Sequence, residues 1–78
     1  MRIPRDFDAK DLIKLLALFG YVPTRQTGSH IRLTTTQNGE HHVTIPNHSP
    51  LRIGTLSSIL SEVVQHLGIS KEELLAAK

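Results

Sequence analysis

The amino-acid sequence predicts an α+β fold of order α-β-β-β-α, followed by a further short helix. Apolar residues recur at helical spacing near the start and again in the second half of the chain, whereas the segment between them alternates apolar and polar residues. Glycine and proline stand at the boundaries between these segments. We expect a three-stranded antiparallel sheet with helices on one face, because helices this short cannot cover both.

The composition is that of a small globular domain. The chain has 78 residues, of which 38% are hydrophobic and 21% charged, and we interpret residues 1–78 as a single domain. It contains no cysteine, which excludes disulfides and thiolate zinc sites and suits a reducing cytoplasm. We see neither a signal-peptide pattern nor an apolar run of the roughly 20 residues that span a bilayer. The formal charge of +2 mildly favours a polyanionic partner.

The first helix is expected over Ala9–Phe19. Asp8 is a suitable N-cap, and Phe7 and Leu12 stand where a hydrophobic staple would join the preceding chain to the helix. Gly20 follows at the position where a left-handed residue commonly ends a helix. Both ends of this helix are therefore marked in the sequence.

Three strands are expected next, over Tyr21–Gln26, His30–Thr36 and Glu40–Pro46. Pro23 confines the first strand to an edge of the sheet, because proline has no N–H to donate to a neighbouring strand. The second and third strands alternate apolar and polar residues, which is typical of strands with one buried face.

Two loops could join the second and third strands. A two-residue turn at Asn38-Gly39 would place Leu33 opposite Thr44, so that apolar residues would face polar ones along the ladder. A three-residue loop over residues 37–39, with Gly39 left-handed, instead pairs Leu33 with Val43. We predict the three-residue loop. It gathers five polar residues on the face turned away from the helices: His30, Arg32, Thr34, His42 and Thr44.

Two helices complete the chain. Apolar residues at i, i+3, i+4, i+7, i+8 and i+11 over Leu56–Leu67 predict a helix that starts near residues 54–55 and stops at Gly68. Ser70 and Glu73 then form the capping-box pattern of a short third helix.

The stretch Thr27–His30 combines a glycine turn, a hydroxyl and an imidazole at the mouth of a strand. Gly28 can adopt backbone angles closed to other residues, and the strand then fixes the direction of His30. A histidine in such a position can transfer protons near neutral pH, although it can also simply bind a backbone carbonyl. Ser29 could orient the imidazole or bind phosphate, but Gly-Ser is also ordinary turn chemistry.

Three arginines could bind phosphate. Arg32 shares the face of His30, and Arg25 lies near the end of the first strand, so both could form charge-assisted hydrogen bonds. Arg52 precedes a helix whose first amides, at residues 54–56, offer a seat for an anion. Alternatively, Arg25 and Arg32 are only solvated surface residues, and the segment at Arg52 only initiates a helix.

The other histidines and the single tyrosine are weaker candidates for a functional site. His41 and His42 are adjacent in a strand and point to opposite faces, so they cannot share one ion, and we expect no metal site. We expect His66, near a helix C-terminus, to be a surface group that interacts with the helix dipole. Tyr21 is the one plausible platform for base stacking, and this scarcity of aromatics argues against sequence-specific base reading.

Several short segments, in this order and spacing, resemble the HicA toxins of type II toxin-antitoxin systems. The resemblance covers nearly the whole chain. The segments are Gly20-Tyr21, Arg25–His30, Ile45–His48, Gly54–Leu56, Ile59-Leu60 and Gly68–Ser70.

The resemblance implies a double-stranded-RNA-binding-domain-like fold, cleavage of messenger RNA independently of translation, and neutralisation by a HicB antitoxin that covers the active face. It implies that His30 is catalytic and that no cofactor is needed. His48 recurs in the family pattern after the third strand. We expect the free toxin to be a monomer. The RNA-binding candidates are Gly28, Ser29, Arg25, Arg32, His48 and Arg52.

RNA carries its own nucleophile, the 2′-hydroxyl, so cleavage requires only proton transfer, charge stabilisation and alignment. One histidine can supply the proton transfer, which predicts a slow enzyme. The alternative is a non-catalytic RNA-binding module in which His30 is a contact residue. A third possibility is a protein that only docks a partner chain.

Overall fold

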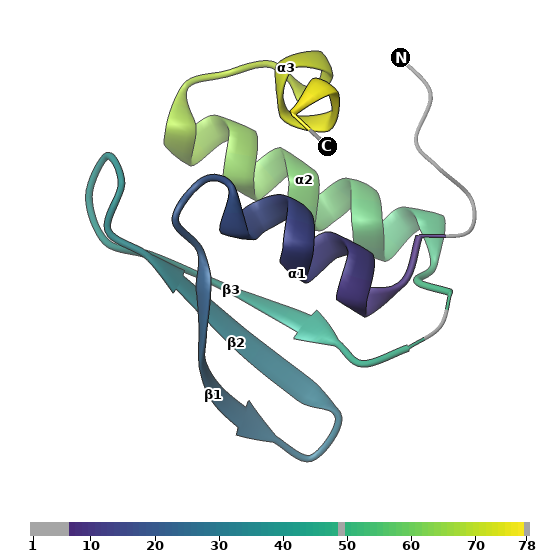
Figure 1. Cartoon of the computed structure of the whole chain (residues 1–78). Helices are drawn as coiled ribbons and strands as arrows, with labels where there is room; N and C mark the ends of the chain where they lie inside the picture. The colour runs from purple at the N-terminus through teal and green to yellow at the C-terminus, as the bar shows by residue number, and fades with distance from the viewer. Residues whose placement is uncertain (1–6, 49, 78) are drawn as a thin grey trace.

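The computed structural model describes residues 7–48 and 50–77, which form two layers (Figure 1). The three strands make one antiparallel sheet of order β1-β2-β3, and α1 and α2 lie on the same side of it. This arrangement confirms the α+β fold expected from the sequence. The elements are α1 (Ala9–Ala17), β1 (Val22–Thr27), β2 (His30–Thr35), β3 (His41–Pro46), α2 (Ile53–Leu67) and α3 (Lys71–Ala76).

Helix α1 begins where predicted and ends two residues earlier than predicted. The backbone N–H of Asp8 donates to the carboxylate of Asp11 at 3.0 Å, which fixes the start. At the other end, the amides of residues 18–20 donate to carbonyls three residues back, at 2.9 to 3.2 Å. This tighter turn replaces the last α-helical turn, so Phe19 lies outside the helix.

The register of the hairpin between β2 and β3 is the predicted one, with Leu33 opposite Val43. The ladder closes one pair earlier than expected, at Thr35 and His41, so residues 36–40 form the connection. Gly39 is left-handed (φ +97°), as predicted, and Asn38 also has a positive φ of 57°. Asparagine tolerates this conformation better than most residues, which explains a feature that the sequence interpretation missed.

Strand β1 forms an edge of the sheet, as Pro23 requires. It runs one residue later than predicted at both ends, because Tyr21 leaves the ladder to enter the core and Thr27 pairs with His30. A β-bulge lies between Pro23 and Arg25, where the register with β2 shifts. Bulges are common on edge strands.

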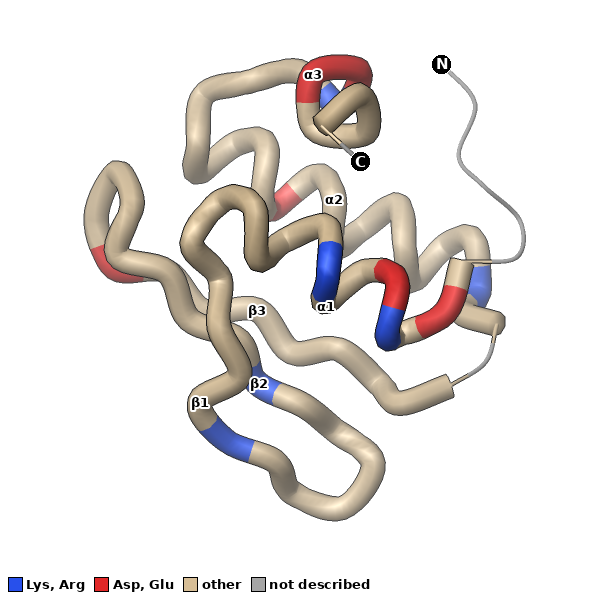
Figure 2. The backbone as a smooth tube through the Cα atoms, viewed as in Figure 1, with Lys and Arg blue, Asp and Glu red and all other residues tan. Residues whose placement is uncertain are grey.

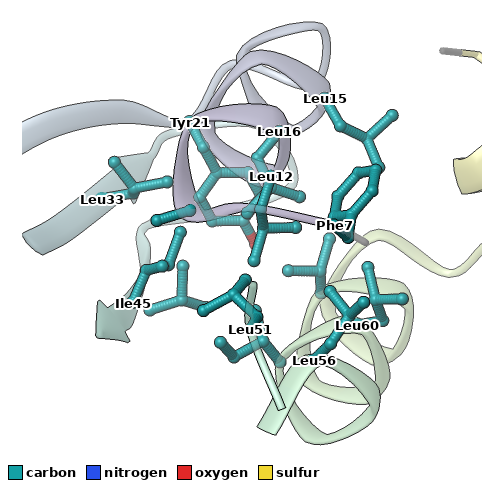
Figure 3. Close-up of a cluster of buried hydrophobic side chains, with 14 of the residues drawn as sticks. Phe7, Leu12, Leu15, Leu16, Tyr21, Leu33, Ile45, Leu51, Leu56 and Leu60 are labelled. Carbon is teal, nitrogen blue, oxygen red and sulfur yellow. The ribbon is translucent and has the colours of Figure 1, made fainter. Parts of the chain in front are cut away.

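The core lies between the helices and the sheet (Figure 3). It receives Leu33, Val43 and Ile45 from the sheet, all at most 2% exposed. Helices α1 and α2 contribute the leucines that face these strands. Because these apolar side chains all point toward the helices, the opposite face of the sheet takes no part in the core.

The last two helices follow the expected pattern. Helix α2 starts at Ile53, one residue before the predicted start, and ends before Gly68 as predicted. Helix α3 begins with the predicted capping box: the Glu73 amide donates to Ser70 Oγ at 3.0 Å, and the Ser70 amide donates to the Glu73 carboxylate at 3.2 Å. Leu74 fixes α3 to the core, since it is fully buried.

Candidate functional site

Gly28 and Ser29 form the two-residue loop that joins β1 to β2 and places His30 at the first position of β2. Gly28 has φ +58°, and glycine at the first of two loop positions is characteristic of a type II′ hairpin turn. The Asn47 amide donates to the Ser29 carbonyl at 2.6 Å, which ties this corner to the chain after β3. The backbone therefore holds His30 from two sides.

His30 lines a hollow of about 260 Å³ on the open face of the sheet. All three strands contribute to it, and none of its lining residues is acidic. Two guanidinium groups, one imidazole and two hydroxyls are a suitable set of groups to bind a phosphate. The lining residues are Arg25, Thr27, His30, Arg32 and Thr44.

The two arginines of this hollow lie directly opposite each other, Arg25 on β1 and Arg32 on β2 (Figure 2). Like charges in this position destabilise a sheet. Among residues 7–48 and 50–77, neither guanidinium is in an ion pair. An anion bound between them would relieve this repulsion, which favours an anionic ligand at this position.

The imidazole of His30 is free to meet a ligand. It is exposed, and none of the hydrogen bonds among the described residues involves its ring. The alternative interpretation, a histidine bound to a backbone carbonyl, is therefore not what the structure shows. Ser29 is also exposed and makes no side-chain hydrogen bond to His30, so it lies at the rim of the site without orienting the ring.

The remaining two candidates, His48 and Arg52, lie together in a second hollow of about 450 Å³ at the start of α2. The two hollows adjoin, since Pro46 lines the second and pairs with His30 across the ladder. The sequence analysis placed Thr44 on the open face and Thr55 at the expected anion seat, but it did not identify Thr27 or Pro46 as lining residues. The second hollow is lined by Pro46, His48, Pro50, Leu51, Arg52 and Thr55.

Tyr21 does not serve as a stacking platform, so that expectation was wrong. Its ring is completely buried, and its hydroxyl lies 2.8 Å from His41 Nδ1. Burial raises the pKa of Tyr21 above its ordinary value, and nearby Glu62 raises it further. Tyr21 thus acts in the core.

His66 does more than interact with the helix dipole. Its ring stacks on that of His41, with centroids 4.4 Å apart and planes 13° apart. Its Nε2–H donates to the carbonyls of Gln37 and Gly39 at 2.9 and 3.0 Å, which ties the hairpin tip to α2. Burial lowers the pKa of His41, and the adjacent His66 lowers it further.

In the part of the chain that the structure describes, no three His, Cys, Asp or Glu side chains are grouped so that they could hold a metal ion. Within the same residues, no helix has both the length and the apolar character needed to cross a membrane.

Comparison with protein families identifies a matching family. The family model described as the HicA toxin of bacterial toxin-antitoxin systems matches residues 9–67, from the start of α1 to the end of α2. Neither the comparison with curated proteins nor the comparison with solved structures gave a match. The matched segment comprises 59 of the 78 residues and includes every candidate site residue. The chain therefore belongs to the HicA toxin family of bacterial toxin-antitoxin systems.

Proposed function

We propose that this toxin is an endoribonuclease that cleaves messenger RNA independently of translation and uses His30 as its catalytic residue. The observation that carries the proposal is the hollow on the open sheet face, where an exposed imidazole shares a pocket with two arginines that form no ion pair with any described residue. The family supports the role of toxin, and the chemistry of the hollow supports RNA as the target.

The reaction would use the nucleophile that RNA already carries. Neutral His30 takes the proton of the 2′-hydroxyl, the 2′-oxygen attacks the adjacent phosphorus, and the bond from phosphorus to the 5′-oxygen breaks. The leaving 5′-oxygen takes a proton from solvent. The products are a 2′,3′-cyclic phosphate and a 5′-hydroxyl.

The two arginines would stabilise the charge that this reaction builds on the phosphate. Arg25 and Arg32 approach from adjacent strands, so each can donate to one non-bridging oxygen. One imidazole supplies the acid-base chemistry, and general acid-base catalysis contributes typically about 10²- to 10⁴-fold. We therefore expect a slow nuclease.

The second hollow would hold the neighbouring part of the RNA backbone. His48 and Arg52 are exposed there, beside the start of α2, where the amides of residues 53–55 precede the first i to i−4 hydrogen bond, from the Leu56 amide to the Arg52 carbonyl. Gly28 and Ser29 form the turn immediately before His30, where the missing side chain of glycine would allow the backbone of a ligand to come close.

A HicB antitoxin would neutralise the toxin by covering the same open face. The HicA family implies pairing with HicB. None of the helices in the described part of the chain covers the open face, and the site residues on that face are exposed. We propose that the free toxin is a monomer.

The function is tested with the purified chain, free of antitoxin, and two RNA oligonucleotides of the same sequence. One carries a 2′-deoxynucleotide immediately before the main cut. We expect cleavage of the all-ribose RNA, no cut at the deoxy position, and loss of all cutting when the antitoxin is added. RNA that is bound but never cut would contradict the proposal and favour the non-catalytic RNA-binding module.

A further inference from the structure

A continuous line of hydrogen bonds crosses the open face beside the phosphate-binding hollow. Thr24 Oγ1 lies 2.9 Å from Thr34 Oγ1, Thr34 Oγ1 lies 2.7 Å from His42 Nδ1, and His42 Nε2 lies 2.9 Å from Glu40 Oε2. We call these four residues, Thr24, Thr34, His42 and Glu40, the relay.

The relay fixes the Glu40 carboxylate in place and leaves part of it free. A carboxylate oxygen only accepts, so His42 Nε2 carries the proton that is donated to Glu40, and His42 Nδ1 faces the Thr34 hydroxyl. Among the described residues, the Glu40 side chain accepts a hydrogen bond from His42 alone, at Oε2. The other carboxylate oxygen of Glu40 can therefore accept a hydrogen bond from a ligand. The Glu40 side chain is 69% exposed.

The relay lies next to the proposed catalytic site. Thr34 and His42 are paired across the ladder, two positions along from Arg32 and Thr44, which line the hollow. Residues two apart on a strand share a face and are separated by about 7 Å. A nucleotide next to the scissile phosphate can therefore reach the relay.

The negative charge of Glu40 determines what it can bind. It is the single acidic residue between Tyr21 and His48, and it lies at the hairpin tip, apart from the arginines (Figure 2). A carboxylate repels the phosphate backbone, so it is unsuited to hold the phosphodiester. It is well suited to accept a hydrogen bond from an amino group on a base.

We propose that the relay is a base-selecting subsite, in which Glu40 accepts a hydrogen bond from the exocyclic amino group of an unstacked RNA base. Cytosine presents an amino group where uracil presents an acceptor oxygen, so the carboxylate favours cytosine and repels uracil. This inference rests on the proposed binding of RNA to the open face. The scarcity of aromatic residues argued against base reading by stacking. A hydrogen bond to Glu40 would allow a base to be read without an aromatic platform.

The test is equilibrium binding of oligo(C) and oligo(U) of equal length, both with 2′-fluoro sugars that lack the nucleophile and cannot be cut. The wild type should bind oligo(C) about tenfold more tightly, the effect of one hydrogen bond to a charged group. In Glu40→Gln the preference should fall to within about twofold, because an amide can donate as well as accept. Thr34→Val removes the hydroxyl that holds His42, and it should also weaken the preference for oligo(C) over oligo(U).

Glu72→Gln is the matched control, because it removes the same charge from an exposed position on helix α3. It should keep the full preference for oligo(C). Equal affinity of the wild type for both oligomers, binding of neither, or an undiminished preference in Glu40→Gln would overturn the subsite. Since nothing is cut in this measurement, its failure is distinct from a failure of the ribonuclease proposal, which the deoxy-substituted RNA tests.

Discussion

The backbone, rather than side-chain partners, positions His30. Gly28 sets the direction of the turn, and the bond from Asn47 to the Ser29 carbonyl holds the turn against the end of β3. The ring itself stays unbound among the described residues, which leaves both of its nitrogens for a ligand. Small changes in the turn should therefore move the imidazole relative to Arg32.

Gly28→Ala tests this role of the turn. Gly28 has φ +58°, and a Cβ there would meet no atom within 4 Å, so the cost is backbone strain alone. We expect a loss of roughly 1 to 2 kcal/mol in the free energy of unfolding, measured by urea denaturation. Gly54→Ala is the matched control: its Cβ also has open space, but its φ is not positive, so the helix should be unchanged or slightly more stable. Equal stability of the two variants would contradict this account.

At the residue scale, only part of the geometry around His30 could be predicted from the sequence. Strand alternation put His30 and Arg32 on one face, because the side-chain period of a strand is fixed at two. The bulge between Pro23 and Arg25, where the register with β2 shifts, was not predicted, because a bulge cannot be located from alternation in an edge strand whose six residues are all exposed.

At the scale of elements, the stacked histidines join the hairpin tip to α2. His41 faces the helices because it is paired with buried Thr35, and His66 reaches it from the last turn of α2. Helical periodicity indicates which face of α2 is apolar, but it does not indicate which loop that helix contacts. For this reason the contact between His66 and the loop carbonyls could not be predicted.

The half-buried position of His41 against His66 predicts a loss of stability in acid. Burial lowers the pKa of His41 below its unfolded value near 6.5, as do His66 and His42, while Glu62 acts in the opposite sense. As pH falls below about 6.5, the unfolded chain therefore binds more protons than the folded chain. The free energy of unfolding that is present above that pH is lost as pH falls through the lower pKa of folded His41. Urea denaturation between about pH 7.5 and 5 should show this loss.

His41→Gln isolates the contribution of this group, because the other four histidines remain. Its free energy of unfolding should fall less on acidification than that of the wild type, even if it is less stable at neutral pH. An equal pH dependence in the two proteins would show that the His41 contact does not carry the effect.

At the scale of the whole molecule, the two layers separate stability from function. The helices cover one face of the sheet and the core fills the space between, so the open face carries the site without contributing to the core (Figure 1). Substitution of exposed residues away from special backbone positions usually changes stability by less than about 0.5 kcal/mol. His30 can therefore be replaced without loss of the fold.

The layered arrangement was predictable because β2, β3, α1 and α2 each have one apolar face, and stacking the two helices on that face of the sheet buries all four. The meeting of the two hollows at Pro46 was not predictable in the same way. It depends on how the chain after β3 returns to the start of α2, and that segment has no periodic pattern to interpret.

The most direct test of the account is the single-turnover rate of RNA cleavage at saturating protein, compared between the wild type and His30→Ala. We predict that the rate falls by about 10²- to 10⁴-fold in His30→Ala. RNA affinity and the urea midpoint should stay close to those of the wild type. Cleavage by His30→Ala at the wild-type rate would contradict the assignment of His30 as the catalytic residue.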